Sequence, residues 1–263
     1  MEERMRIKLK FSGLKNKAIP RDHFYQLSGL VYSMIEQANP DYSKWLHDKG
    51  FVDGNKSFKF FCFSRIIPEP AGYTRGGDNG ELIVFTKNEG TLYISSPVRE
   101  FMQNLVDFLL INREIRVMNH SLLIERAFAT SQEFSDGEEL FKCISPIVLS
   151  TRSEEYTTPT YLRAYQEPDL FDEYLTRNAK EKLKIFHGVE SDIELTVDRE
   201  YLKRTGRKSN LRLKIKEDTE VFGSMVPVKI TGKKEEIGFL YHCGLGQKNS
   251  LGMGMVELAG KRF

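Results

Sequence analysis

Several kinds of sequence pattern are absent from this chain of 263 residues. No apolar run approaches the roughly 20 residues that a membrane-spanning helix needs, and no apolar signal region follows the first charged residues. The three cysteines, Cys62, Cys143 and Cys243, are far apart and lack CxxC spacing, which argues against a disulfide framework and a zinc site. We therefore expect a cytoplasmic protein that contacts no membrane and has no structural zinc site.

Charge is nearly balanced over the whole chain but is unevenly distributed along it. Residues 1–65 contain 12 Lys and Arg against 7 Asp and Glu, and residues 199–263 contain 14 against 7, whereas residues 66–198 contain 13 against 23. If the two ends of the chain meet in space, they form a basic zone that attracts a phosphate backbone, on a protein whose other side is acidic. Ordinary solvated charge is the alternative interpretation.

Hydrophobic periodicity predicts alternating strands and helices in the first half of the chain. Residues 5–11 alternate polar and apolar side chains, as a half-buried strand does. Pro20 is expected in the first turn of an amphipathic helix that reaches Ala38, and residues 39–50 have the cap, first turn and terminal glycine of a second, short helix. Residues 57–63 are aromatic on both faces, which is typical of a central strand. Further strands are predicted at 80–86, 91–96 and 113–129, and a helix at 98–111.

A similar order of elements recurs in the second half. Strands are predicted at 139–150, 191–197, 210–216, 220–230 and 251–258, and helices at 167–186 and 232–242. The βαββαβ order is that of a ferredoxin-like, or RRM-like, unit. The sequence therefore predicts an α+β fold of two tandem ferredoxin-like domains, residues 1–130 and 131–263, with the polar segment 130–138 as the linker.

A glycine-rich tail lies close to the end of the chain. Residues 244–254 contain four glycines, including Gly244 and Gly246, around Lys248 and Asn249. Glycine permits positive φ and close approach, so amide groups can converge on phosphate oxygens while Lys248 adds charge. A dinucleotide fingerprint needs a strand before the glycines and a helix after them, and a P-loop needs GxxxxGK[ST]; the tail matches neither pattern.

Other segments, taken together with this tail, resemble one known family. The matching segments are 5–9, 30–32, 46–48, 60–64 and 144–147. In their order and spacing the chain resembles the RAMP superfamily, and within it the CRISPR repeat-processing endoribonucleases, over nearly its whole length. The resemblance implies metal-independent cleavage of CRISPR precursor RNA within each repeat, with no cofactor, by attack of a 2′-hydroxyl that leaves 5′-hydroxyl and 2′,3′-cyclic phosphate ends. It implies CRISPR repeat RNA, precursor and mature, as the partner, and leaves a CRISPR effector complex open as a second partner.

The family pattern implies that Tyr32, His47 and Lys59 are catalytic. Their side-chain types suit proton transfer and stabilisation of a dianionic phosphorane. Helical geometry places Tyr32 at the edge of a buried face, and His47 in the last turn of its helix, where the helix dipole favours imidazolium. Without the resemblance, both would be interpreted as ordinary packing or surface residues. Lys56 is an alternative to Lys59, and His23 fits packing better than catalysis.

The candidates for RNA binding come from the tail and from basic strands. In the tail they are Lys248, Asn249, Gly244 and Gly246. Ser145, Arg152, Lys214 and Lys229 are further candidates, each equally consistent with a solvated surface. The sequence leaves open whether the repeat is recognised as a hairpin or as a single strand, and whether the protein is a monomer or a homodimer. The alternative functions are a RAMP-type guide-RNA-binding subunit that does not cut, and a ferredoxin-like metabolite-binding protein.

Overall fold

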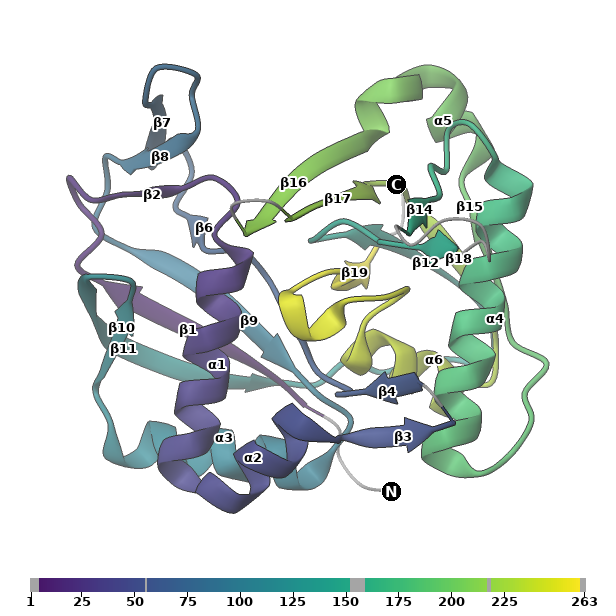
Figure 1. Cartoon of the computed structure of the whole chain (residues 1–263), viewed down its shortest axis with the longest axis horizontal. Coiled ribbons are helices and arrows are strands. Elements are labelled where there is room, and N and C mark those ends of the chain that lie inside the picture. Colours follow the sequence, from purple (N-terminus) through teal and green to yellow (C-terminus); the bar gives the residue numbers. More distant parts are fainter. Residues whose placement is uncertain (1–4, 55, 152–158, 217–218, 261–263) are drawn as a thin grey trace.

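Two antiparallel sheets, one from each half of the chain, form the framework of the structure (Figure 1). The computed structural model describes residues 5–54, 56–151, 159–216 and 219–260. Each sheet is built on a βαββαβ unit whose fourth, first, third and second strands lie side by side. This is the ferredoxin-like arrangement, so the predicted fold class is confirmed.

The first unit runs through β1, α1, β5, β9, α3 and β11, with the strand order β11-β1-β9-β5. Its elements are β1 (Arg6–Ser12), α1 (Phe24–Ala38), β5 (Cys62–Phe63), β9 (Gly90–Ser95), α3 (Arg99–Ile111) and β11 (His120–Thr130). The apolar residues of β1 are buried, and so is the stripe of α1 formed by Leu27, Val31 and Ile35. The alternating pattern of β1 and the helical stripe of α1 therefore place one face of the strand and one face of the helix in the same hydrophobic core.

The second unit runs through β12, α4, β15, β18, α6 and β19, with the strand order β15-β18-β12-β19. Its elements are β12 (Gly137–Cys143), α4 (Pro168–His187), β15 (Glu194–Val197), β18 (Val228–Gly232), α6 (Lys234–Cys243) and β19 (Val256–Leu258). Helix α4 begins with a proline, and Gly188, which follows its last residue with a φ of 73°, caps its C-terminal end.

Shorter elements are inserted into both units. In the first they are β2 (Ala18–Pro20), α2 (Pro40–Asp48), β3 (Phe51–Asp53), β4 (Lys56–Phe58), β6 (Ile67–Pro68), β7 (Tyr73–Gly76), β8 (Leu82–Phe85) and β10 (Glu114–Val117). In the second they are β13 (Ser150–Thr151), β14 (Thr160–Tyr161), α5 (Arg199–Thr205), the 3₁₀ turns η1 (Gly206–Ser209) and η2 (Asn249–Leu251), β16 (Asn210–Lys216) and β17 (Thr219–Ser224). No helix in the described part of the chain is long and apolar enough to cross a bilayer.

Each hydrophobic core contains side chains from the other half of the chain. Leu213 and Ile215 of β16 pack in the core of the first unit, whereas Phe60, from the first half of the chain, packs in the second core. Arg6 of β1 is buried and donates hydrogen bonds to the carbonyl oxygens of Tyr241 (3.1 Å) and Val256 (2.9 Å). The two ends of the chain therefore meet. β11 ends at Thr130 and β12 begins at Gly137, and the division into residues 1–130 and 131–263 stays a prediction.

Several predicted elements differ from the structure. The strand predicted at 113–129 is two antiparallel strands, β10 and β11, and the strand predicted at 139–150 ends at Cys143. Pro20 ends β2 instead of starting a helix, and α1 begins at Phe24. The single strand predicted at 57–63 is wrong: β4 pairs with β3, β5 pairs with β9, and Phe60 between them has a φ of 47°. The strand predicted at 220–230 is two strands, β17 and β18, in different sheets.

Candidate active site

The three predicted catalytic residues lie together beside the junction of α1 and α2. Tyr32 lies on α1, His47 in the last turn of α2, and Lys59 directly after β4. The ring centroids of Tyr32 and His47 are 5.4 Å apart, with the rings edge to face. Nζ of Lys59 donates a hydrogen bond to the carbonyl oxygen of His47 at 2.9 Å. A phenol, an imidazole and an ammonium group therefore meet in one small region.

Local sequence features explain why α2 can present His47 at this position. Asn39 caps the helix, because its Oδ1 accepts a hydrogen bond from the backbone N–H of Tyr42 at 3.1 Å. Leu46 is fully buried, whereas the neighbouring His47 side chain is 71% exposed. The helix thus anchors on its apolar face and leaves the imidazole accessible to a substrate.

The two nitrogens of His47 have different surroundings. Nδ1 lies 3.1 Å from Oδ1 of Asp48, and a carboxylate only accepts hydrogen bonds, so Nδ1 carries a proton in this pair. Nε2 is the nitrogen left to face a substrate.

The hydroxyl of Tyr32 lies near a residue from the far end of the chain. The ring packs edge to face on Phe61, and Ser250 approaches the hydroxyl. Burial raises the pKa of Tyr32 to about 12, although the Ser250 side chain acts in the opposite direction. At neutral pH the phenol is therefore protonated and offers a hydrogen-bond donor.

The two candidate lysines point in different directions. Lys59 is half-buried over Gly50, and desolvation lowers its pKa, while the Asp48 carboxylate opposes that shift. Nζ of Lys56 lies 2.5 Å from Oε1 of Glu181 on α4. The structure thus brings Lys59, and not Lys56, to His47.

His23 is a packed residue, as its position on the first helix suggested. It is fully buried; Nδ1 lies 2.8 Å from the carbonyl oxygen of Pro20, and Nε2 accepts a hydrogen bond from the N–H of Ile66 at 3.0 Å. Burial lowers the pKa of His23 to about 4. The ring is neutral at physiological pH and links the start of α1 to the chain beyond β5.

The glycine-rich tail forms a loop between the two units (Figure 1, yellow) and is organised by a buried lysine that sequence analysis missed. Nζ of Lys182, on α4, donates to the carbonyl oxygens of Gly244 and Gly246 and to Oδ1 of Asn249, each at 2.7 Å. Nδ2 of Asn249 donates to two further carbonyl oxygens of the loop. The signal for Lys182 was its place on the apolar stripe of α4, between Ala179 and Leu183.

These contacts give part of the predicted RNA-binding set a structural role. The side chain of Asn249 is engaged inside the loop, and Gly244 and Gly246 are buried with their carbonyl groups directed at Lys182. Their contribution is therefore to the shape of the loop. Lys248 is half-buried with a φ of 59° and stays a candidate for RNA contact.

The four weaker candidates have different surroundings. Ser145 is fully buried and its Oγ accepts a hydrogen bond from the N–H of Met255 at 2.8 Å, so its surroundings favour a structural role over the predicted RNA contact. Lys229 pairs with Glu138 at 3.1 Å, and Lys214 is exposed on β16. Arg152 lies outside the described residues.

A basic strip that sequence analysis did not single out lies on the second unit. It consists of Arg204 in α5 and Arg207 and Lys208 in η1, which are all exposed. We call these three residues the α5 basic strip. In Figure 1, α5 lies at the opposite end of the molecule from α2, with the glycine-rich loop between them. The signal was the run of basic residues in 199–216, which contains one acidic residue.

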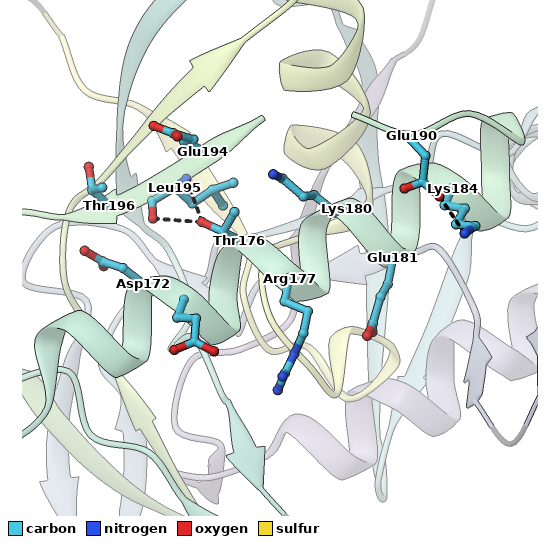
Figure 2. Close-up of a pocket in the computed structure, with 11 residues that line it drawn as sticks. Asp172, Thr176, Arg177, Lys180, Glu181, Lys184, Glu190, Glu194, Leu195 and Thr196 are labelled. Atoms are coloured by element: carbon cyan, nitrogen blue, oxygen red, sulfur yellow. Dashed lines mark hydrogen bonds and ion pairs between the residues drawn. The ribbon is translucent and has the colours of Figure 1, made fainter. Parts of the chain in front are cut away.

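A depression along the outer face of α4 lacks the character of a phosphate-binding site (Figure 2). Acidic side chains outnumber basic ones in its lining. Nζ of Lys184 pairs with Glu190 at 2.6 Å, and Oγ1 of Thr176 exchanges hydrogen bonds with the backbone of Leu195. Because its negative charge repels a phosphate backbone, we do not place the substrate there. In the described part of the chain, no three His, Cys, Asp or Glu residues are grouped as metal ligands.

Comparisons with known proteins agree with the fold and identify the family. The family model for "CRISPR-associated protein Cas6, N-terminal" matches residues 18–127, and that for "CRISPR associated protein Cas6, C-terminal" matches residues 129–258. A CRISPR-associated endoribonuclease Cas6 from Methanocaldococcus jannaschii is 33% identical, with 97% of this chain and 93% of the relative covered. The one from Pyrococcus furiosus is 24% identical, with 93% and 85% covered.

A solved structure described as "CRISPR associated protein Cas6" superimposes with a TM-score of 0.74, at 30% identity, and covers 98% of this chain and 100% of its own. The resemblance found in the sequence is confirmed by these matches, which extend over both ferredoxin-like units. The chain belongs to the Cas6 family of CRISPR-associated proteins.

Proposed function

We propose that this chain is an endoribonuclease that cleaves CRISPR repeat RNA, without a metal ion, at the site formed by Tyr32, His47 and Lys59. The observation that carries the proposal is the convergence of these three side chains from α1, α2 and the segment after β4. Membership of the Cas6 family, in which the relatives at 33% and 24% identity are named endoribonucleases, supports the same activity.

The geometry suits attack by a 2′-hydroxyl on the adjacent phosphate. The 2′-oxygen forms a bond to phosphorus and gives its proton to solvent at the exposed site, and the bond to the 5′-oxygen breaks. In the imidazolium form, His47 gives its Nε2 proton to the departing 5′-oxygen and keeps the Nδ1 proton that faces Asp48. The products are a 2′,3′-cyclic phosphate and a 5′-hydroxyl.

Tyr32 and Lys59 have roles that do not need proton transfer. With a pKa of about 12, the Tyr32 hydroxyl is a hydrogen-bond donor to a phosphate oxygen or to the sugar at neutral pH. Lys59 lies next to His47 and contributes positive charge to the phosphorane. Its ammonium is already oriented by the His47 carbonyl oxygen, so little reorganisation accompanies the reaction.

The RNA path we propose runs from the α5 basic strip, across Lys248 in the glycine-rich loop, to His47. Phosphate contacts of this kind set affinity and register, whereas the cleavage chemistry takes place only at the far end. A CRISPR effector complex is a further proposed partner, which would receive the cleaved guide RNA.

The test is cleavage of repeat RNA from the CRISPR array of the same genome in the presence of EDTA. Wild-type protein is expected to cut unmodified RNA and to leave RNA with a 2′-deoxy nucleotide at the cut position intact. His47→Ala is expected to slow cleavage by about 10² to 10⁴ while RNA remains bound. His187→Ala, in the last turn of α4, is the matched control and is expected to cut at the wild-type rate.

Two results would contradict the proposal. Cleavage that needs added Mg²⁺, or that proceeds on the 2′-deoxy RNA, would exclude 2′-hydroxyl attack. RNA binding without cleavage in the wild-type protein would indicate a guide-RNA-binding subunit that does not cut.

A further inference from the structure

The environment of Lys182 is unusual for a lysine. The residue is 1% exposed, and its three ammonium protons match three acceptors, each 2.7 Å away. Lysine is almost never fully buried without partners, because removal of an ammonium group from water is costly. All three acceptors belong to the glycine-rich loop, namely Gly244, Gly246 and Asn249. Lys182 therefore fixes this loop against α4, and all three protons of its ammonium group are hydrogen-bonded to the loop.

The opposite side of the same loop contacts α1. The carbonyl oxygen of Ser250 accepts a hydrogen bond from Oγ of Ser28 at 2.8 Å, and the Ser250 side chain lies near the Tyr32 hydroxyl. Ser250 directly follows Asn249, which Lys182 holds. A continuous chain of contacts thus leads from a buried cation in the second unit to the phenol of the candidate active site in the first.

The loop has little freedom to adjust if one of these contacts is lost. An added Cβ at Gly252 would lie 2.6 Å from both Phe24 and Phe63, and one at Gly254 would overlap the carbonyl oxygen of Leu245. The loop is packed on both sides, so a shift at Asn249 is transmitted to Ser250.

We propose that Lys182 is a positioning residue for RNA cleavage, acting through Asn249 and Ser250 to hold the Tyr32 hydroxyl in its reactive orientation. The inference rests on the proposed function, because it requires that Tyr32 takes part in cleavage. It adds that the second unit sets the rate of the chemical step, and not only the affinity for RNA.

The experiment compares Lys182→Met, which removes the ammonium group and keeps the length of the side chain, in two backgrounds. Single-turnover cleavage is measured with RNA at saturation, after the affinity of each variant for 2′-deoxy repeat RNA is known. In the otherwise wild-type protein, Lys182→Met is expected to slow cleavage by about ten- to a hundredfold, since small misplacements of a reactive group cost factors of this size. In a Tyr32→Phe background it is expected to cause no further loss, because the group it positions is absent.

Thr176→Val is the matched control on the same helix. It removes the two hydrogen bonds that the Thr176 hydroxyl exchanges with Leu195, and it touches neither the loop nor Tyr32. A general destabilisation of the second unit would slow both Thr176→Val and Lys182→Met. The proposal requires that only Lys182→Met is slow.

The outcomes separate this inference from the proposed function. If Tyr32→Phe cuts at the wild-type rate, the proposed role of Tyr32 is wrong and the inference falls with it. If Tyr32→Phe is slow but Lys182→Met cuts like wild type, or slows both backgrounds equally, only the inference is overturned. If Lys182→Met does not fold, Ser250→Ala is measured in the same two backgrounds, and the same pattern of rates decides.

Discussion

Gly50 offers a way to move Lys59 without a change to any proposed catalytic side chain. It follows α2 with a φ of 62°, and an added Cβ would lie 2.6 Å from the carbonyl oxygen of Phe58 and 2.9 Å from Cδ of Lys59. The left-handed conformation costs an alanine about 1–2 kcal/mol. Overpacking typically adds about 1–3 kcal/mol. Because domains are commonly stable by roughly 5–15 kcal/mol, Gly50→Ala is expected to fold with a reduced free energy of unfolding.

The displaced Lys59 is expected to reduce cleavage. Its ammonium group is held by the His47 carbonyl oxygen, and the new methyl group would lie 3.2 Å from Nζ. Loss of one oriented charge at a developing phosphorane is expected to slow single-turnover cleavage by about ten- to a hundredfold. The affinity for RNA should change much less, since the substitution removes no positive charge.

Gly54→Ala is the matched control for this experiment. Gly54 has a φ of 55°, but an added Cβ would meet no atom within 4 Å. It therefore carries the backbone cost alone, about 1–2 kcal/mol by urea unfolding, and should cut at the wild-type rate. If Gly50→Ala also cuts at the wild-type rate despite its larger loss of stability, the position of Lys59 does not limit cleavage and its assignment is wrong.

Three further predictions concern pH, salt and packing. The pKa of His23 is about 4 in the folded protein against an ordinary 6.5, so its contribution to the free energy of unfolding is complete above pH 6.5 and is lost as pH falls through 4. Urea unfolding at a series of pH values should show a loss of roughly 3 kcal/mol on acidification that His23→Gln lacks. Equal pH profiles for the two proteins would contradict this. Replacement of Arg204, Arg207 and Lys208 by glutamine should weaken RNA binding and reduce the slope of log affinity against log salt by about 2 to 3. Cleavage at saturating RNA should be unchanged. An unchanged slope would show that the RNA binds elsewhere. Ser145→Ala should lower the free energy of unfolding by about 1–3 kcal/mol, because it leaves the Met255 N–H without its acceptor. The affinity for RNA should be unaltered. A loss of RNA affinity with no loss of stability would support Ser145 as an RNA contact.

The elements with strong local signals were predicted well. The second predicted helix starts where Asn39 provides a capping oxygen, and α1 ends at Ala38, as the apolar stripe indicated. Gly50 ends the α2 region with positive φ, as a glycine after a helix should. In each case residues close in sequence determine the structure, so no knowledge of the rest of the fold is needed.

The aromatic segment at 57–63 shows where local patterns fail. Phe61 packs on Phe101 in the first core, with ring centroids 4.7 Å apart, whereas Phe60 packs on Phe239 in the second, at 5.5 Å. Two adjacent aromatic residues on opposite faces are typical of a central strand, but here the two side chains pack in different hydrophobic cores. The backbone reaches both by positive φ at Phe60, which a tertiary contact imposes and a sequence pattern does not reveal.

The candidate site was foreseen in its residue types, but its dependence on the second unit was not. The resemblance implied Tyr32, His47 and Lys59, and the structure brings these three together. Lys182 was overlooked because a lysine on a helix is normally solvated; its place on the apolar stripe of α4 indicated burial, but its three acceptors are distant in sequence. Contacts between residues so far apart can be inferred only after the packing of the two units is known.

The glycine-rich loop is the feature whose interpretation changes most. We predicted that its glycines bring amide groups close to phosphates, but Gly246 and Gly252 have positive φ and leave no space for a Cβ against the surrounding protein. The glycines are thus required by the close approach of two hydrophobic cores, whatever RNA contact the loop makes. Because the same loop places Ser250 near Tyr32, we expect substitutions in it to change the rate of cleavage as well as RNA binding. We therefore expect that residues from both ends of this chain contribute to cleavage.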